Sequence, residues 1–507
     1  MKKGITLLLL VSMLLGSVTA CGKSEVPEEA NTATSEVVTE NETSEGELYT
    51  VKLCMYSEAQ EDDAVVQEEI NKILKEKYNI QLELVPISPG EFDERMKLMS
   101  TSNEDYDLTF SATWVNTLKS NVAREAFLPL NDLLETEAGA LLKESVPQYL
   151  FDATTINGNI YAVPVQPVAA AQTAYYVQKD LVEKYNLDVN SIVEPEDIEP
   201  FLEQIRDNEP DLIPMCEGES IMNLGIATPD GLETLVGIGD AITEGCAMPM
   251  DDDNLQVIST YESEVAKKAM LRLNDWYQRG FIRKDVATVT DNSAELTANK
   301  YAVLVRKCHS GGEAELLTKY NKEYVMIPLS SPVLFAGSLA VNMHAVNVNS
   351  KNPEAAVKML GVLHSDAEVF DLLLYGIEGT HHTINADGRV EMIADSGYDR
   401  SSEGWALGDS SLATLLPGQD EKMWELQAES VDAAALSKMV GFSFNPENVQ
   451  AEMAQIKTVA SEYFRRWYYA EDFDAYWNEY HEKQVQAGLE TVMTELQTQV
   501  DAWKAAK

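Results

Sequence analysis

The sequence is poor in positive charge. Its 507 residues include 38 Lys and Arg but 84 Asp and Glu, which gives a formal net charge of -46. Proteins that bind nucleic acids or anionic membranes through their surface use cations to replace the counterions of phosphate groups. The composition therefore argues against a nucleic-acid partner and favours a neutral or cationic ligand, because an anionic ligand would be repelled at long range.

Cysteine and metal-ligand patterns are also scarce. The sequence has 5 Cys and 6 His, with no Cys-x-x-Cys pair and no His residues at the spacing of a zinc site. His381 and His382 are adjacent, which is a weak arrangement for a metal, and the acidic run from Asp251 to Asn254 lacks the glycine and distal Glu of a calcium loop. We therefore expect no metal or cofactor, a solvated loop at 251–254, and buried structural thiols at Cys54, Cys216, Cys246 and Cys308.

Signatures of enzymes are missing as well. No Gly-x-Ser-x-Gly elbow, phosphate-binding loop or zinc motif is present. A glycoside hydrolase needs only two carboxylates about 5 to 10 Å apart, and so many acids leave that possibility open. The alternation of strands and helices described below does not suggest a barrel, however, and we predict no catalytic residues.

The amino terminus has the pattern of a secreted lipoprotein. Lys2 and Lys3 precede an apolar run from Ile5 to Leu15, which is shorter than the ~20 residues of a membrane-spanning helix. The run ends in Val-Thr-Ala-Cys-Gly, which resembles a lipobox with Cys21 as the lipidated residue. An ordinary cleavage site with an incidental Cys is the alternative. We predict a signal peptide at 1–20 and a protein held at the extracellular face of the cell membrane by its lipid anchor alone.

The segment after Cys21 cannot bury a core. Residues 24–47 contain eight Glu and no Lys or Arg. Such a chain repels itself and lacks apolar surface to bury, so we predict an extended tether at 21–47.

From Leu48 onward the pattern alternates between strand and helix. Apolar residues alternate up to Tyr56, and further strands are predicted at 80–86 and 106–111, with helical spacing between them. This order predicts an α/β fold with a parallel, doubly wound sheet flanked by helices. Ligands bind such sheets beyond the carboxyl ends of the strands, where Tyr56, Glu58 and Trp114 follow.

The length predicts two lobes, because a single core seldom grows this large. Asn157-Gly158 predicts a tight hairpin, and a first crossover between lobes is expected near Pro164 to Val168. A second is expected near Val325 to Pro328. We assign lobe 1 to 48–164, lobe 2 to 165–327, a return of lobe 1 to 328–375, and a helical carboxyl-terminal region completing the lobes to 376–507. In lobe 2 we predict strands at 173–178 and 301–305 and helices near 179–185, 195–207 and 263–279. The last predicted helix has an apolar side formed by Leu489, Val492, Leu496, Val500 and Trp503.

A resemblance follows from the order of short motifs. The chain resembles the extracellular solute-binding proteins of carbohydrate ABC importers (family 1, maltose-binding-protein-like) in Asp107-Leu108, Trp114, Leu128-Pro129-Leu130, the stretch from Gly158 to Pro164, Lys179-Asp180-Leu181, and the stretch from Asn352 to Ala356. Tyr375 to His382, Trp405-x-x-Gly408 and Gly441 to Phe444 resemble a subgroup with a characteristic carboxyl-terminal domain of the DUF3502 type. Together these motifs span nearly all of residues 48–507.

The resemblance implies capture of a small neutral solute by closure of two lobes, delivery to the membrane subunits of an ABC permease, and a monomeric protein that is not an enzyme. Aromatic rings pack on the C–H faces of sugars, so Tyr56, Trp114, Tyr175 and Trp405 are candidate ligand contacts. On residue type alone, a packed core or surface position is the more common one for such a ring, and only the position of Trp114 after a strand favours the ligand contact further. Glu58 and Glu378 are candidate acceptors for sugar hydroxyls. His309, after the strand at 301–305, is a weaker candidate.

Two departures from the family pattern affect these candidates. Val177 stands where relatives commonly have an aromatic residue, and Tyr175 on the same strand face is the expected substitute. Thr380-His381-His382 replaces Lys-His-Tyr of the subgroup, which puts a contact through that loop in doubt. A binding lipoprotein for peptides or another polar solute remains an alternative, and a lipid-anchored glycoside hydrolase is a further one.

Overall fold

The computed structural model describes residues 48–506 except 218, 223, 235–244, 290 and 309–311. The predicted signal peptide, the lipobox with Cys21, the acidic tether and His309 lie outside the described residues. No helix of the described part is long and apolar enough to cross a membrane.

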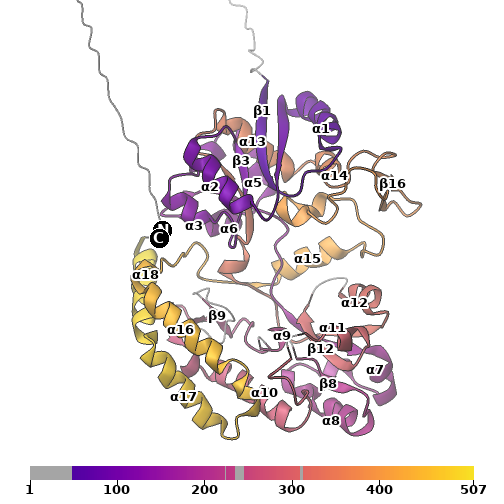
Figure 1. Cartoon of the computed structure of the whole chain (residues 1–507), viewed down its shortest axis with the longest axis vertical. Coiled ribbons are helices and arrows are strands. Elements are labelled where there is room, and N and C mark those ends of the chain that lie inside the picture. Colours follow the sequence, from indigo (N-terminus) through magenta and orange to yellow (C-terminus); the bar gives the residue numbers. More distant parts are fainter. Residues whose placement is uncertain are drawn as a thin grey trace, which may run out of the picture. The chain divides into compact units, whose positions relative to one another are not determined.

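Lobe 1 is built on a five-stranded sheet in the order β2-β1-β3-β15-β6. Figure 1 shows β1 and β3 of this sheet with α1 and α2 on opposite sides of them. Its strands are β1 (Tyr49–Tyr56), β2 (Ile80–Ile87), β3 (Leu108–Ala112), β15 (Asn342–Val346) and β6 (Val163–Pro164). β1 pairs in parallel with both β2 and β3, as predicted, but β15 is antiparallel to β3 and β6. The sheet is therefore mixed rather than purely parallel. β15 returns from lobe 2, so no short β-α-β crossover fixes its direction.

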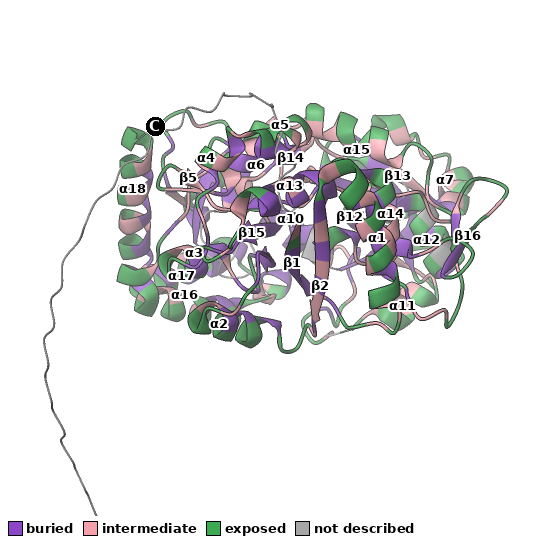
Figure 2. Cartoon of the chain, turned by 90° about the horizontal axis from the view of Figure 1, so that it is seen from above, coloured by how far each residue is buried: buried purple, intermediate pink, exposed green. Residues whose placement is uncertain are grey.

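The helices of lobe 1 follow the predicted apolar spacing. α1 (Asp63–Tyr78) buries Val66, Ile70 and Leu74, and α2 (Phe92–Ser102) follows β2. α13 (Pro353–Leu363) begins at Asn352, whose side chain accepts the backbone N–H of Ala355, and α14 (Ala367–Tyr375) follows. The helices expose their outer faces, β3 and β15 are largely buried, and β2 has partly exposed residues along its length (Figure 2).

The predicted hairpin is present. β4 (Thr155–Ile156) and β5 (Asn159–Ile160) pair in antiparallel fashion around Asn157 and Gly158. Both turn residues have positive φ, 51° and 81°. A two-residue turn of this kind requires Asn or Gly because other side chains are strained there.

Lobe 2 contains a four-stranded sheet in the order β13-β7-β12-β8. Its strands are β7 (Thr173–Gln178), β8 (Ile213–Met215), β12 (Tyr301–Lys307) and β13 (Tyr324–Pro328), flanked by α7 (Lys179–Tyr185), α8 (Glu199–Asn208) and α10 (Glu264–Gln278). Only β8 and β12 pair in parallel. This sheet is also mixed. β9 (Leu232–Thr234), β10 (Cys246–Pro249) and β11 (Ile258–Ser259) form a second, antiparallel sheet.

The carboxyl-terminal helices complete the core of lobe 2. α16 (Gln450–Tyr463), α17 (Phe473–Gln486) and α18 (Leu489–Ala506) share one hydrophobic cluster with β7, α8 and α10. Asn274 of α10 donates from its amide to the backbone carbonyls of Trp467 and Ala470, at 2.7 and 2.9 Å. The predicted final helix is confirmed, with Leu489, Val492, Leu496 and Val500 buried and Trp503 packed against the same core.

Three chain segments connect the two lobes. The first lies between β6 and β7, and the second leaves β13 through β14 (Val333–Leu334) toward β15. The third follows α15 (Met423–Asp432) as β18 (Ala435–Leu436), which pairs in parallel with β14. The third segment has no counterpart among the predicted crossovers, because the region 376–507 divides between the lobes near residue 437.

Candidate ligand-binding site

Four aromatic rings meet at the carboxyl ends of the lobe 1 strands. Tyr56 ends β1, Trp114 follows β3, and Trp405 lies in the short helix η6 (Gly404–Ala406). The ring centroids of Tyr56 and Trp114 are 5.2 Å apart, and those of Trp114 and Trp405 are 6.3 Å apart. Phe110 lies beneath them, with its ring 5.5 Å from Tyr56 and 5.8 Å from Trp405. We call Tyr56, Trp114 and Trp405 the aromatic platform.

The platform is open to solvent on one side. Trp114 is 52 % exposed and Trp405 is 43 % exposed, whereas Phe110 is fully buried. Soluble proteins seldom leave several large rings together at the surface unless they meet a partner or ligand. The platform is therefore the strongest candidate for a ligand-binding surface among the described residues.

A network of buried amides holds the turn that carries Trp114. The Asn116 side chain donates to the carbonyl of Phe110 at 2.8 Å, and the Ser111 hydroxyl donates to the carbonyl of Asn116 at 2.8 Å. The Ala112 N–H donates to the carbonyl of Val115 at 2.9 Å. Asn116 has φ 45°, a left-handed conformation that Asn tolerates better than most residues. The exposed indole therefore extends from a fixed turn.

Glu58 lies in the loop directly after Tyr56. Its side chain is exposed, and its Oε1 accepts the hydroxyl of Ser88 at 2.7 Å. The remaining acceptor capacity of this carboxylate faces solvent, where it can accept hydroxyl donors. The structure thus brings Tyr56, Glu58, Trp114 and Trp405 to one region although Trp405 is far from the others in sequence.

The remaining predicted contacts lie elsewhere. Tyr175 is fully buried in β7, where its hydroxyl donates to the carbonyl of Pro195 at 2.8 Å, and burial raises its pKa well above the usual value. A ligand in solvent cannot reach this ring, so it is not part of the platform, and Val177 on the same strand is equally buried. Glu378 is exposed, and its backbone bridges to His382.

The motif from Tyr375 to His382 has internal partners. Gly376 has φ 68°, and a Cβ atom there would lie 2.5 Å from the ring of His381. Nδ1 of His381 accepts the N–H of Ile377 at 2.9 Å, and its Nε2 lies 3.1 Å from the carboxylate of Asp62. These bonds attach the end of α14 to the start of α1.

A buried ion network lies behind the platform. Arg400 is fully buried and pairs with Asp63 at 2.7 Å and with Glu403 at 3.0 Å. Burial raises the pKa of the Glu403 carboxyl, while hydrogen bonds from Ser57 and Arg400 oppose that shift. Phe110, Ser57, Arg400 and Glu403 were not identified from the sequence. Phe110 reads as an ordinary strand residue, and a single Arg in a loop has no distinguishing pattern.

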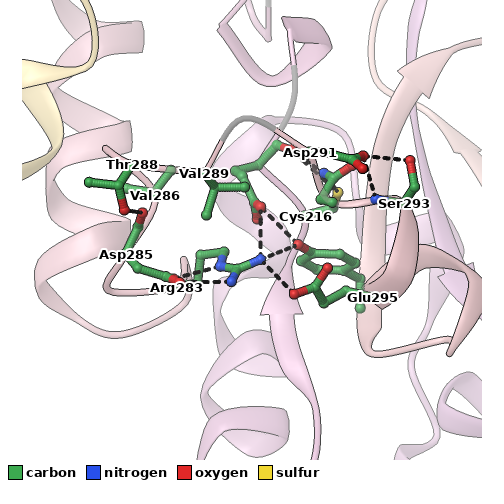
Figure 3. Close-up of polar contacts among 12 residues, drawn as sticks. Cys216, Arg283, Asp285, Val286, Thr288, Val289, Asp291, Ser293 and Glu295 are labelled. Carbon is green, nitrogen blue, oxygen red and sulfur yellow. Dashed lines mark hydrogen bonds and ion pairs between the residues drawn. The ribbon is translucent and has the colours of Figure 1, made fainter.

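A second polar network closes the end of β8 in lobe 2 (Figure 3). The carboxylate of Glu217 is buried and accepts the hydroxyl of Tyr301 at 2.8 Å, with Arg283 at 3.6 Å. Arg283 also pairs with Asp285 at 2.6 Å and Glu295 at 3.2 Å, and Figure 3 shows its guanidinium between these two acids. Burial raises the pKa of Glu217. The network fixes the loop before β12, and we assign it no ligand.

Metal binding gains no support from the described residues. They contain no group of three or more His, Cys, Asp or Glu placed to hold a metal ion. In the 251–254 loop, Asp252 accepts two backbone N–H groups of its own turn, and Asp253 pairs with Lys438 at 2.7 Å. Among the thiols, Cys54, Cys216 and Cys246 are buried and Cys308 is partly buried.

Sequence comparison finds one matching domain family and one related transport protein. Residues 438–505 match the domain of unknown function DUF3502. The chain is 26 % identical over 402 residues, 78 % of each chain, to a carbohydrate ABC transporter substrate-binding protein of Streptococcus pneumoniae.

Solved structures of solute-binding proteins are similar in fold to this chain. The N-glycan transport solute binding protein (NgtS) from Streptococcus pneumoniae matches with a TM-score of 0.72 and 23 % identity, covering 89 % of this chain and 98 % of that one. An HMO-binding, ABC-transporter-associated solute binding protein from Bifidobacterium longum infantis matches with a TM-score of 0.60 and 15 % identity, covering 90 % and 99 %. These similarities confirm the resemblance indicated by the sequence motifs, and the chain has the fold of a carbohydrate ABC transporter substrate-binding protein with a carboxyl-terminal DUF3502 domain.

Proposed function

We propose that this chain is the substrate-binding component of an ABC importer and binds a neutral oligosaccharide on the aromatic platform, without catalysing a reaction. The observation that carries the proposal is the cluster of the partly buried Tyr56 with the exposed rings of Trp114 and Trp405 at the carboxyl ends of β1 and β3. Flat aromatic faces pack against the C–H faces of sugar rings, and a nearby carboxylate such as Glu58 accepts hydroxyl donors. The net charge of -46 disfavours an anionic sugar.

The related proteins suggest which oligosaccharides to test. Structures of similar fold have been solved with Man5GlcNAc, at a TM-score of 0.58, and with kestose, at 0.55. Both are neutral and longer than a monosaccharide, which matches a platform of three rings rather than one. Neutral peptides form the matched alternative set, because a peptide-binding protein would share this fold.

A thermal-shift screen of the protein from residue 22 onward tests the proposal. A ligand at ~100 times its Kd adds ~2.7 kcal/mol to the stability of the folded state, so a true ligand raises the melting temperature. We expect at least one neutral oligosaccharide to do so and the peptides not to. Chromatography of the same samples should return the sugar intact. Release of shorter sugars would instead support a glycoside hydrolase.

The anchor is a separate part of the proposal. A substrate-binding component must stay near its permease, and the lipobox ending in Cys21 would supply that attachment through acylation. Cys21→Ser should therefore accumulate as unprocessed precursor or leave the membrane fraction. Normal maturation and membrane retention of that variant would contradict lipidation at Cys21.

A further inference from the structure

Arg400 lies at the junction of the two chain segments that bring Tyr56 and Trp405 together. Its side chain is 0 % exposed, although it follows a long surface excursion through β16 (His382–Ile384) and β17 (Val390–Met392). The charged guanidinium is retained in the interior because acidic side chains surround it. A buried charge is tolerated only when it is paired and hydrogen-bonded in this way.

The acceptors of Arg400 come from both segments. On the side of Tyr56, its Nη1 donates to the hydroxyl of Ser57, and its Nη2 donates to the carbonyl of Glu58 at 3.2 Å. On the side of Trp405, its Nη1 donates to Glu403 Oε2 at 3.0 Å. The Ser57 hydroxyl also donates to Glu403 Oε1 at 3.0 Å, which closes a ring of bonds.

A third attachment fixes the direction of the guanidinium. Asp63, the first residue of α1, accepts from Nη2 at 2.7 Å. The planar fork of arginine can serve these several acceptors at once, whereas the single ammonium of lysine on a flexible stem cannot. Without the cation, the partly buried carboxylates of Asp63 and Glu403 would also repel one another.

The segment that carries Arg400 is also hydrogen-bonded to the residues just before α1, where the Asp62 N–H donates to the carbonyl of Gly397 at 3.1 Å. Gln60 donates from its amide to the carbonyl of Asp399 at 2.7 Å and accepts the Asp399 N–H at 2.5 Å. The cross-links therefore lie within a few residues of Tyr56 on one side and of Trp405 on the other. The rings of Tyr56 and Trp405 also lie edge to face, with their centroids 6.1 Å apart.

We propose that Arg400 is a positioning residue of the ligand site: through Ser57, Glu58 and Glu403 it holds the Trp405 ring in register with Tyr56 and Trp114. This inference rests on the proposed function for its effect on binding, but the positioning itself exists without ligand. A surface fixed before binding loses less conformational entropy when the ligand arrives, so a displaced ring lowers affinity even if every platform residue is present.

The positioning can be measured in the ligand-free protein. Incorporation of 5-fluorotryptophan gives one fluorine NMR resonance per Trp, and Trp114→Phe and Trp405→Phe assign the two platform signals. We expect Arg400→Met to shift and broaden both. Arg272→Met is the matched control, because Arg272 is also buried and pairs with Glu196 at 3.1 Å, but in lobe 2. It should leave the platform signals in place. Unchanged signals in Arg400→Met would overturn the proposal.

A milder variant decides the matter if Arg400→Met does not fold. Ser57→Ala removes one acceptor of Arg400 and one donor to Glu403 while leaving the Asp63 pair intact. We expect a smaller displacement of the Trp405 signal in this variant, and Arg400→Lys should restore part of the wild-type position relative to Arg400→Met. A wild-type Trp405 signal in Ser57→Ala would count against the proposal.

Binding gives a second and separable readout. With Man5GlcNAc as the probe, Arg400→Met should bind at least ten-fold more weakly than wild type, and Arg272→Met within two-fold. Equal affinity of Arg400→Met and wild type would overturn the role in binding. Failure of the wild type to bind Man5GlcNAc or any other neutral oligosaccharide would speak against the proposed function, while the fluorine spectra would still decide the positioning.

Discussion

At the scale of single residues, the platform owes its position to the ends of two neighbouring strands. Tyr56 and Trp114 follow parallel strands, and parallel strands end at the same edge of a sheet. That relation could be predicted from the sequence. Tyr175 shows where the same reasoning fails: β7 lies between β12 and β13 and is buried on both faces, so strand alternation cannot identify a solvent-facing side.

The exposed indole of Trp114 should matter for binding and little for folding. Trp114→Ala removes a side chain that is about half exposed and that extends from a turn held by Asn116. We therefore expect the affinity for the ligand to fall about ten-fold or more, while the free energy of unfolding changes by less than about 1 kcal/mol. Calorimetric titration and urea unfolding measure the two quantities. Tyr469→Ala is the control, since Tyr469 is 45 % exposed in the carboxyl-terminal region. If the Trp114→Ala protein unfolds, Trp114 stabilises the core and is not primarily a ligand contact.

At the scale of elements, apolar periodicity predicts the helices and strands of lobe 1 and the parallel pairing of β1, β2 and β3, but not the antiparallel direction of β15. β15 is separated from β3 by the whole of lobe 2, and local pattern carries no information on how such distant strands pair. The division of residues 376–507 between the lobes was equally hidden. Arg400 and Trp405 remain in lobe 1, whereas the helices after residue 439 bury their apolar faces in lobe 2.

Glu233 joins β9 of lobe 2 to two of the crossing segments. Its carboxylate accepts the N–H of Ala336 at 2.7 Å and the hydroxyl of Ser437. Burial raises its pKa from 4.5 to about 7, while both hydrogen bonds oppose the shift. The folded protein therefore holds this proton more tightly than the unfolded chain. The contribution of Glu233 to the free energy of unfolding is therefore complete below about pH 4.5 and is lost as the pH rises through 7.

The expected size of this effect is roughly 3 kcal/mol, from 1.36 kcal/mol per pKa unit. Glu233→Gln has no carboxylate to ionise, so its stability relative to wild type should increase between pH 5 and pH 8. Urea unfolding of both proteins at the two pH values measures the difference. Ser437→Ala keeps the carboxylate and should keep the pH dependence. A Glu233→Gln protein with the same pH dependence as wild type would contradict the assignment.

At the scale of the whole molecule, two lobes joined by three chain segments have the anatomy of a protein whose lobes move about a hinge. A ligand that contacts both lobes only in the closed state shifts the population toward it. Small-angle scattering should therefore give a smaller radius of gyration with a saturating oligosaccharide than without it. An unchanged radius of gyration at saturation would exclude a large closure of the lobes. The control is Trp114→Ala with the same sugar at a concentration that does not saturate this variant, where the radius should change less.

If a neutral oligosaccharide lies on the aromatic platform, its ring protons lie close to the indole protons of Trp114 and Trp405, and NMR detects that proximity. Nuclear Overhauser effects between sugar ring protons and the indole protons of selectively labelled tryptophan report contacts below about 5 Å, the range in which a sugar face packs on a ring. With the sugar found by the screen, we predict such effects to Trp114 and Trp405, identified by their loss in Trp114→Phe and Trp405→Phe. A saturating sugar that shows no effect to either indole would contradict the account.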